Sequence, residues 1–84
     1  MKTFYRTVYK TANGELIKSH NFYDLETVQR IATSLNQKYK QLGDYSVQGV
    51  NISELKPDQL ARLYRLKLIT YEELKTYAGL HIAE

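Results

Sequence analysis

The residues best suited to bind a charged partner lie in the first 23 positions of the chain. Four basic side chains stand there against a single acidic one, Glu15, while the rest of the chain is neutral, so this segment holds the whole formal net charge of +3. Basic side chains neutralise phosphates or carboxylates, and tyrosine rings between them stack on bases or pack on a protein surface. We therefore expect a binding surface that includes Tyr5, Arg6, Tyr9, Lys10 and Lys18.

A second basic cluster follows near the C-terminal end. Arg62 and Arg65 are three residues apart, so they share one face of a helix. We include both in the predicted binding surface. Each basic cluster also has an interpretation without a partner: lysines on an outer strand prevent pairing with other chains, and a basic helix face is often only solvated.

Residues for catalysis or for metal binding are scarce. The chain has no cysteine, which excludes thiolate ligands, disulfides and cysteine catalysis. His20 and His81 have no partner at a spacing typical of a metal or catalytic site, and no glycine-rich loop precedes a helix. Glu72 and Glu73 suit the first turn of a helix. We expect no catalytic residues, no metal and no cofactor, and hence a protein that is not an enzyme.

A β-hairpin is predicted to position the basic segment. Residues 3–11 alternate β-branched, aromatic and basic types, and residues 15–22 form the return strand. Asn13-Gly14 between them favours a two-residue type I′ turn, because both residues tolerate a positive φ. Such a turn pairs Lys10 with Ile17.

This register predicts the two faces of the hairpin. One face holds Phe4, Arg6, Val8, Lys10 and Ile17, and the other holds Tyr5, Thr7, Tyr9, Leu16 and Lys18. We favour the face of Phe4, Val8 and Ile17 as the core face. Because both faces are partly apolar, the second must be covered by the C-terminal helices or by a partner.

A long amphipathic helix and a third strand follow. Asp24 is a suitable N-cap for a helix over 25–42, with apolar residues at steps of three and four, and Gly43 suits its left-handed C-terminal position. Residues 45–52 predict a strand with a bulge near Gly49.

Two short helices end the chain. Pro57 suits the first turn of a helix with Leu60, Leu63 and Tyr64 on its apolar side. Thr70 and Glu73 form a capping box for a helix over 71–78 with Leu74 and Tyr77 inward, which Gly79 is expected to end.

The expected fold class is α+β in a single domain over 1–84. A ββαβ unit over 1–52 contains a three-stranded antiparallel sheet and one long amphipathic helix, and a short helical hairpin with a tail follows over 53–84. We expect the ββαβ unit to be the more stable part, because its turn, cap and periodicity agree.

Two resemblances are present, the first bearing on architecture only and the second on function. The stretch LARLYRLKLITYEELKTYAGL at 60–80 resembles a SHOCT-like helical hairpin, with Lys67 where glycine is common in its turn. The basic start MKTFYRTVYK, the hairpin, and the Lys-, Gln- and Asn-rich helix resemble small phage and mobile-element proteins of low-GC Gram-positive bacteria. Anti-CRISPR proteins belong to that pool.

This resemblance implies a non-catalytic inhibitor of a host defence nuclease complex in the cytoplasm of a bacterial cell. Its partner would be a host protein or ribonucleoprotein, with guide RNA or DNA as a further contact, and neither a membrane nor a small-molecule substrate. An alternative is a small nucleic-acid-binding module, a regulator or recombination accessory that uses the basic hairpin. A third alternative is a structural or assembly protein of a virion.

Overall fold

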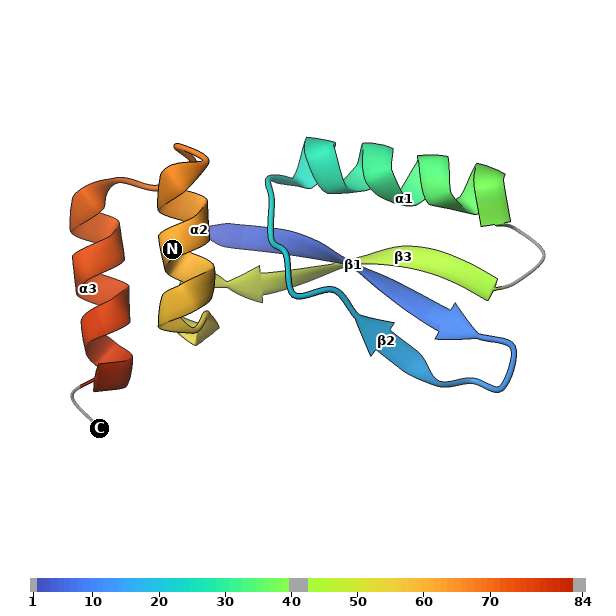
Figure 1. Cartoon of the computed structure of the whole chain (residues 1–84), viewed down its shortest axis with the longest axis horizontal. Coiled ribbons are helices and arrows are strands. Elements are labelled where there is room, and N and C mark those ends of the chain that lie inside the picture. Colours follow the sequence, from blue (N-terminus) through green and yellow to red (C-terminus); the bar gives the residue numbers. More distant parts are fainter. Residues whose placement is uncertain (1, 40–42, 83–84) are drawn as a thin grey trace.

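The chain folds as an α+β protein, which confirms the predicted class. A computed structural model describes residues 2–39 and 43–82. Its three strands form one antiparallel sheet in the order β2-β1-β3, with α1 on one side and α2 and α3 beyond one end (Figure 1). The elements are β1 (Thr3–Thr11), β2 (Leu16–Lys18), α1 (Leu25–Tyr39), β3 (Gly43–Asn51), the short 3-10 helix η1 (Ile52–Glu54), α2 (Pro57–Arg65) and α3 (Tyr71–Ile82).

The hairpin between β1 and β2 has a three-residue loop, so the predicted type I′ turn is wrong. The N–H of Gly14 donates to the carbonyl of Thr11 at 3.0 Å, and the N–H of Thr11 donates to the carbonyl of Glu15 at 2.9 Å. Gly14 has a φ of 87°, whereas Asn13 is not among the residues with positive φ. This pattern is a type I turn followed by a glycine in a G1 bulge.

The longer loop changes the pairing by one residue. Lys10 lies opposite Leu16 rather than Ile17, and Val8 lies opposite Lys18. Because side chains alternate between the faces of a sheet, a shift of one residue moves the whole return strand to the other face. Lys18 therefore joins Arg6 and Lys10, and Ile17 joins the face of Tyr9.

The strand β3 pairs with β1 without interruption, so the predicted bulge at Gly49 is absent. Gly49 has another role, because a Cβ there would lie 3.1 Å from Cε1 of Tyr5 and 3.2 Å from Cγ2 of Thr3. The missing side chain lets the Tyr5 ring lie over the strand, as aromatic residues do beside glycines in sheets. Gly43 begins β3 opposite Thr11, and its predicted role at the end of a helix over 25–42 depends on 40–42, which lie outside the described residues.

The helix α1 covers the face of the sheet that carries Thr7. Thr7 lines a small pocket together with Val28 and Ile31 of the helix, and Val28 is fully buried. As predicted, Asp24 caps the helix: its carboxylate accepts hydrogen bonds from the N–H of Thr27 at 3.2 Å and from the hydroxyl of Thr27 at 2.6 Å. The helix ends at Tyr39, and the remainder of the predicted helix, 40–42, lies outside the described residues.

The two C-terminal helices are joined by a tight turn. Lys67 has a φ of 62°, its N–H donates to the carbonyl of Tyr64 at 2.9 Å, and the N–H of Leu68 donates to that of Leu63 at 3.0 Å. These two bonds define a Schellman motif, with lysine in the position that glycine usually takes. Beyond it, the capping box of Thr70 and Glu73 is confirmed by reciprocal bonds of 2.9 and 3.1 Å.

Gly79 does not end the last helix, since α3 continues to Ile82. Within α3, Leu74 and Tyr77 face the core, as expected. Tyr64 of α2, which the sequence places on the apolar side, is instead 42% exposed. Its ring lies 5.9 Å from that of Tyr71, also exposed, so the two tyrosines form an outer pair.

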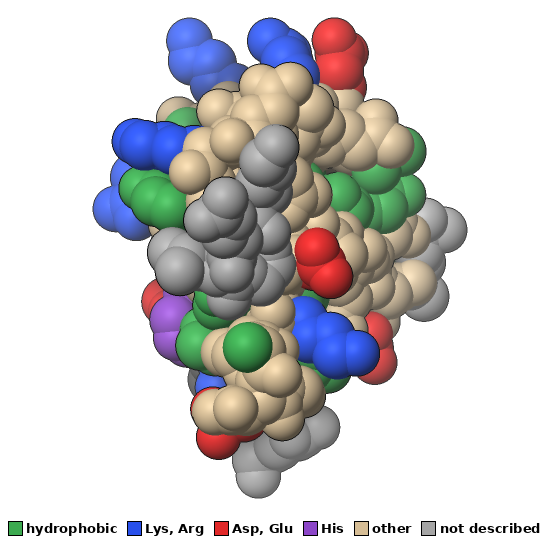
Figure 2. Space-filling view, turned by 90° about the vertical axis from the view of Figure 1, so that its right-hand side faces the viewer, with side chains coloured by type: hydrophobic (Ala, Val, Ile, Leu, Met, Phe, Trp, Pro, Cys, Tyr) green, Lys and Arg blue, Asp and Glu red, His purple; other side chains and the backbone are tan. Residues whose placement is uncertain are grey.

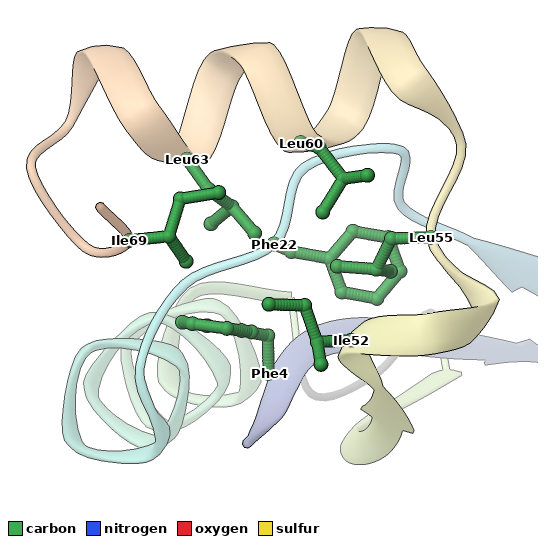
Figure 3. Close-up of a cluster of buried hydrophobic side chains, with 7 residues drawn as sticks. All are labelled: Phe4, Phe22, Ile52, Leu55, Leu60, Leu63 and Ile69. Atoms are coloured by element: carbon green, nitrogen blue, oxygen red, sulfur yellow. The ribbon is translucent and has the colours of Figure 1, made fainter. Parts of the chain in front are cut away.

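The largest cluster of buried side chains lies where the sheet meets α2, and no residue of α1 belongs to it. Phe4 of β1 points toward α2, whereas α1 lies on the other side of that strand (Figure 3). The C-terminal helices therefore contribute much of the core, in contrast to the emphasis that the sequence places on the ββαβ unit. The cluster contains Phe4, Phe22, Ile52, Leu55, Leu60, Leu63 and Ile69.

Candidate binding face of the sheet

The sheet face opposite α1 carries most of the basic residues predicted to bind a partner. Alternation along the strands and the observed register place ten side chains on it. Phe4 belongs to the core cluster and Val50 packs against it, which leaves eight. Val8 is buried among them and Arg6 and Gln48 are half-buried, while the other five are exposed. We call this surface the polar sheet face; it consists of Arg6, Val8, Lys10, Leu16, Lys18, Asp44, Ser46 and Gln48.

Arg6 is held by contacts within the protein. Its Nε donates to Oε1 of Gln48 at 2.8 Å, and its Nη1 donates weakly to the carbonyl of Ser19 at 3.5 Å. The guanidinium also lies 5.1 Å from the centroid of the Phe22 ring, within cation–π range. Arg6 therefore joins β1 to β3 and to the segment after β2, and its side chain is only partly exposed.

Lys10 and Lys18 are the freely presented cations of this face. Both are exposed, and neither lies within ion-pair distance of a carboxylate in the described part of the chain. They are diagonal neighbours on adjacent strands, a relationship that places Cα atoms about 7–8 Å apart. Leu16, directly opposite Lys10, is 60% exposed, so an apolar side chain adjoins the two cations.

Tyr5 and Tyr9 lie on the opposite face, so the structure does not bring them together with the lysines. Both are half-buried. Tyr5 covers Gly49, and the ring of Tyr9 lies 4.8 Å from that of Tyr45, tilted by 37°. Tyr5 and Tyr9 are separated from Arg6 and Lys10, as the predicted faces had it, and also from Lys18, which the predicted register placed with the tyrosines.

The predicted helical cluster is also divided. Arg62 turns inward: its Nη2 donates to the hydroxyl of Tyr23 at 2.6 Å, its Nη1 donates to the carbonyl of Phe22 at 3.4 Å, and its guanidinium lies 4.7 Å from the Tyr23 ring. Arg62 thus joins α2 to the segment before α1. Arg65, in the last turn of α2, is exposed.

Only two of the four basic side chains in the first 23 residues are exposed without a partner in the described part of the folded chain. Lys2 is bound to Glu73 of α3 at 2.9 Å, and Arg6 is held internally, which leaves Lys10 and Lys18. From the end of the molecule that carries the hairpin loop, basic side chains appear in separate places with acidic ones between them (Figure 2). The distinctive feature is therefore a small mixed surface in which Lys10, Lys18 and Leu16 adjoin one another and Asp44 lies opposite Lys10 on β3 without an ion pair to it.

Besides the buried Val8, sequence reasoning missed four members of this face: Leu16, Asp44, Ser46 and Gln48. The assumed turn put Leu16 with the tyrosines. Ser46 and Gln48 lie in β3 with no chemical signal of their own, and their positions follow only from the pairing of β3 with β1. Gly14 is the residue from which the correct register could have been predicted. A glycine that follows a type I turn is typical of a three-residue hairpin loop, as well as of the two-residue turn that we assumed.

Two carboxyl groups have pKa values below their ordinary range, and both cap helices. The hydroxyl of Thr27, which donates to Asp24, is the largest cause of the lowered pKa of that residue. For Glu73 the hydrogen bond from the N–H of Thr70 is the largest cause of the lowered pKa, followed by that from Lys2. Both shifts arise from contacts that stabilise the fold.

Neither a metal site nor a membrane span is found in the described parts of the chain. Across residues 2–39 and 43–82, His, Asp and Glu side chains form no group of three or more that could hold a metal ion. None of the helices in those ranges has the length and apolar character needed to cross a bilayer.

Comparison of the chain with protein-family models, with curated proteins and with solved structures finds no significant match.

Proposed function

We propose that the chain is a non-catalytic binding protein that holds an acidic surface of a protein partner against the polar sheet face. The observation that carries this proposal is the placement of Lys10, Lys18 and Leu16 side by side. An exposed leucine next to two unpaired cations suits a partner surface with carboxylates around an apolar patch, because charge complementarity steers the encounter and apolar burial adds affinity.

A protein partner is favoured over a nucleic acid by the position of the tyrosines. Single-stranded nucleic acids are usually bound by aromatic rings that stack on bases beside a basic groove. Tyr5 and Tyr9 lie on the face that α1 covers, and the polar sheet face has no aromatic side chain. The alternative, a small nucleic-acid-binding module, would depend on phosphate contacts from Lys10 and Lys18 alone.

The specific form of the proposal is inhibition of a defence nuclease complex of the CRISPR type in the bacterial cytoplasm. This step is supported by the resemblance to small phage and mobile-element proteins and by the small size of the chain. Its test is DNA cleavage by a guide-loaded CRISPR nuclease from a low-GC Gram-positive bacterium, measured with increasing amounts of the protein. Inhibition by the native chain and its loss in the double variant Lys10→Glu, Lys18→Glu are expected.

The matched control is Arg30→Glu combined with Lys38→Glu, which changes the net charge equally on exposed positions of α1. This control should inhibit as the native chain does. Equal loss in both double variants would mean that total charge matters rather than the polar sheet face. Salt-dependent binding of the native chain to a DNA duplex, without any effect on nucleases, would instead support the nucleic-acid module.

A further inference from the structure

The strand β3 forms an outer edge of the sheet, and part of its backbone is unpaired. Hydrogen bonds in an antiparallel pair alternate along each strand. The N–H of Ile52 donates to the carbonyl of Lys2 at 3.0 Å, which places the even-numbered residues of β3 in bonded pairs with β1. The backbone N–H and C=O groups of Tyr45, Val47 and Gly49 therefore point away from the sheet.

Only the first of these three residues is satisfied by a neighbouring side chain. Oδ1 of Asn36 accepts from the N–H of Tyr45 at 2.7 Å, and Nδ2 of Asn36 donates to the carbonyl of Tyr45 at 2.9 Å. No corresponding partner exists for Val47 or Gly49 among the described residues, and Gly49 is exposed. Outward backbone groups of this kind are a template for another extended strand.

Apart from Tyr45, which Asn36 of α1 covers, this edge lacks the features that usually prevent such pairing. Residues 45–53, YSVQGVNIS, contain no charged residue and no proline, and no bulge interrupts β3. Edge strands of soluble proteins are commonly protected by lysine, proline, bulges or short length. The other edge of the sheet is protected in this way, because β2 has three residues and ends at Lys18.

We propose that β3 pairs antiparallel with β3 of a second copy of the chain, around a two-fold axis at Gln48. This register places Val47 of each copy opposite Gly49 of the other, so that the unpaired backbone groups satisfy one another. It leaves the capped Tyr45 outside the pairing. The two sheets then join into one, with both polar sheet faces on the same side.

Three properties of the edge favour a second copy as its occupant. The segment 45–53 is uncharged, and the proposed register places Asp44 of each copy opposite Ile52 of the other, so the two copies approach without repulsion between like charges. Gly49 has no side chain and the Tyr5 ring lies over it, so Val47 of the other copy would contact that ring in place of a side chain of residue 49. Oε1 of Gln48 accepts from Arg6, while the amide N–H groups of Gln48 can donate to Gln48 of the other copy. The edge is therefore complementary to itself, and this inference does not depend on the proposed function.

The test begins with sedimentation equilibrium of the whole chain from low micromolar to millimolar concentration, where a monomer–dimer equilibrium is expected. A chemically synthesised chain with an N-methyl group on the backbone nitrogen of Gly49 is the decisive variant. It removes the outward N–H without touching the pairing with β1. Because two hydrogen bonds are lost per dimer, self-association should weaken by about tenfold or more.

Thermal unfolding checks that the N-methylated chain still folds, and Arg30→Glu on the exposed side of α1 should associate as the native chain does. In a mixed isotope-labelled sample, NMR should show a contact between the Hα atoms of Ser46 and Val50 of different copies. These residues face each other only in the proposed pairing. A chain that stays monomeric at millimolar concentration, or a dimer without this contact, would overturn the proposal, as would a monomer that binds only extended peptides of other proteins.

Discussion

The guanidinium of Arg6 donates from Nε to Oε1 of Gln48 over 2.8 Å, and this bond ties the central strand of the sheet to its outer neighbour. The two residues are directly opposite each other in the β1–β3 pairing. Phe22, with its ring 5.1 Å from the guanidinium, adds a third contact. Arg6 is thus part of the packing as well as of the polar sheet face, and substitutions there should affect folding.

Arg6→Glu should lower the free energy of unfolding by about 1–3 kcal/mol, because it removes a charge-assisted hydrogen bond and places a carboxylate beside an acceptor. Lys18→Glu is the matched control: it makes the same change in charge at an exposed position opposite Val8 and should stay within about 0.5 kcal/mol of the native chain. Urea unfolding measures both. Equal stability of the two variants would show that the bond to Gln48 contributes little.

The helix caps could be predicted from the sequence because their partners are close in the chain. Asp24 meets Thr27, and Thr70 meets Glu73, so each bond forms within one helical turn. The fold class followed from the same kind of local pattern. These predictions required no knowledge of tertiary structure.

The composition of the polar sheet face could not be predicted in this way, because it depends on one residue in the hairpin loop. Asn13-Gly14 is compatible with a two-residue turn and with a three-residue loop, and the difference moves Leu16 and Lys18 to the other face. The other members of this face are determined by contacts between residues far apart in the sequence. The partner of Arg6, Gln48, is 42 positions away, and no pattern near Arg6 indicates it.

Replacing Lys67 by glycine should stabilise the protein. With a φ of 62°, Lys67 has a left-handed backbone conformation that glycine adopts without steric cost. Part of the gain is offset by the greater freedom of glycine in the unfolded chain, so the free energy of unfolding should rise by about 0.5–1 kcal/mol. Lys67→Ala, which keeps a Cβ, should change stability by less, within about 0.5 kcal/mol.

Gly14→Ala in the hairpin loop is the reverse change, because it introduces a Cβ at a residue with a positive φ. Gly14 has a φ of 87°, and a Cβ there would meet no atom within 4 Å, so backbone conformation alone is tested. Gly14→Ala should lower the free energy of unfolding by about 1 kcal/mol. Chemical denaturation of the substituted chains measures each change. A stabilising Gly14→Ala would contradict the assigned three-residue loop.

Leu63→Ala should be among the most destabilising substitutions in the chain. Leu63 is fully buried in the cluster between the sheet and α2, and removal of a buried leucine side chain typically costs about 2–5 kcal/mol. Leu16→Ala is the control, since Leu16 is 60% exposed and should change stability by about 0.5 kcal/mol or less. Similar losses in both would argue against the C-terminal helices as a main part of the core.

Acid should weaken the protein through Asp24 and Glu73. The pKa of each carboxyl is lower in the folded chain than its ordinary value of 3.8 for Asp24 and 4.5 for Glu73. Each group therefore stabilises the fold above its ordinary pKa, and this contribution is lost as pH falls through the lower pKa of the folded state. Below a pH of about 4.5, the native chain should lose stability progressively.

Asp24→Asn and Glu73→Gln isolate these two contributions. Each variant should be less stable than the native chain at neutral pH, and the difference should disappear in strong acid, where the native carboxyl is protonated as well. Glu15→Gln, at an exposed position beside the hairpin loop, is the matched control. Urea unfolding across the acidic range measures the differences. If the gap between the native chain and Glu73→Gln stayed constant down to strong acid, the contacts of the ionised carboxylate with Thr70 and Lys2 could not be its source.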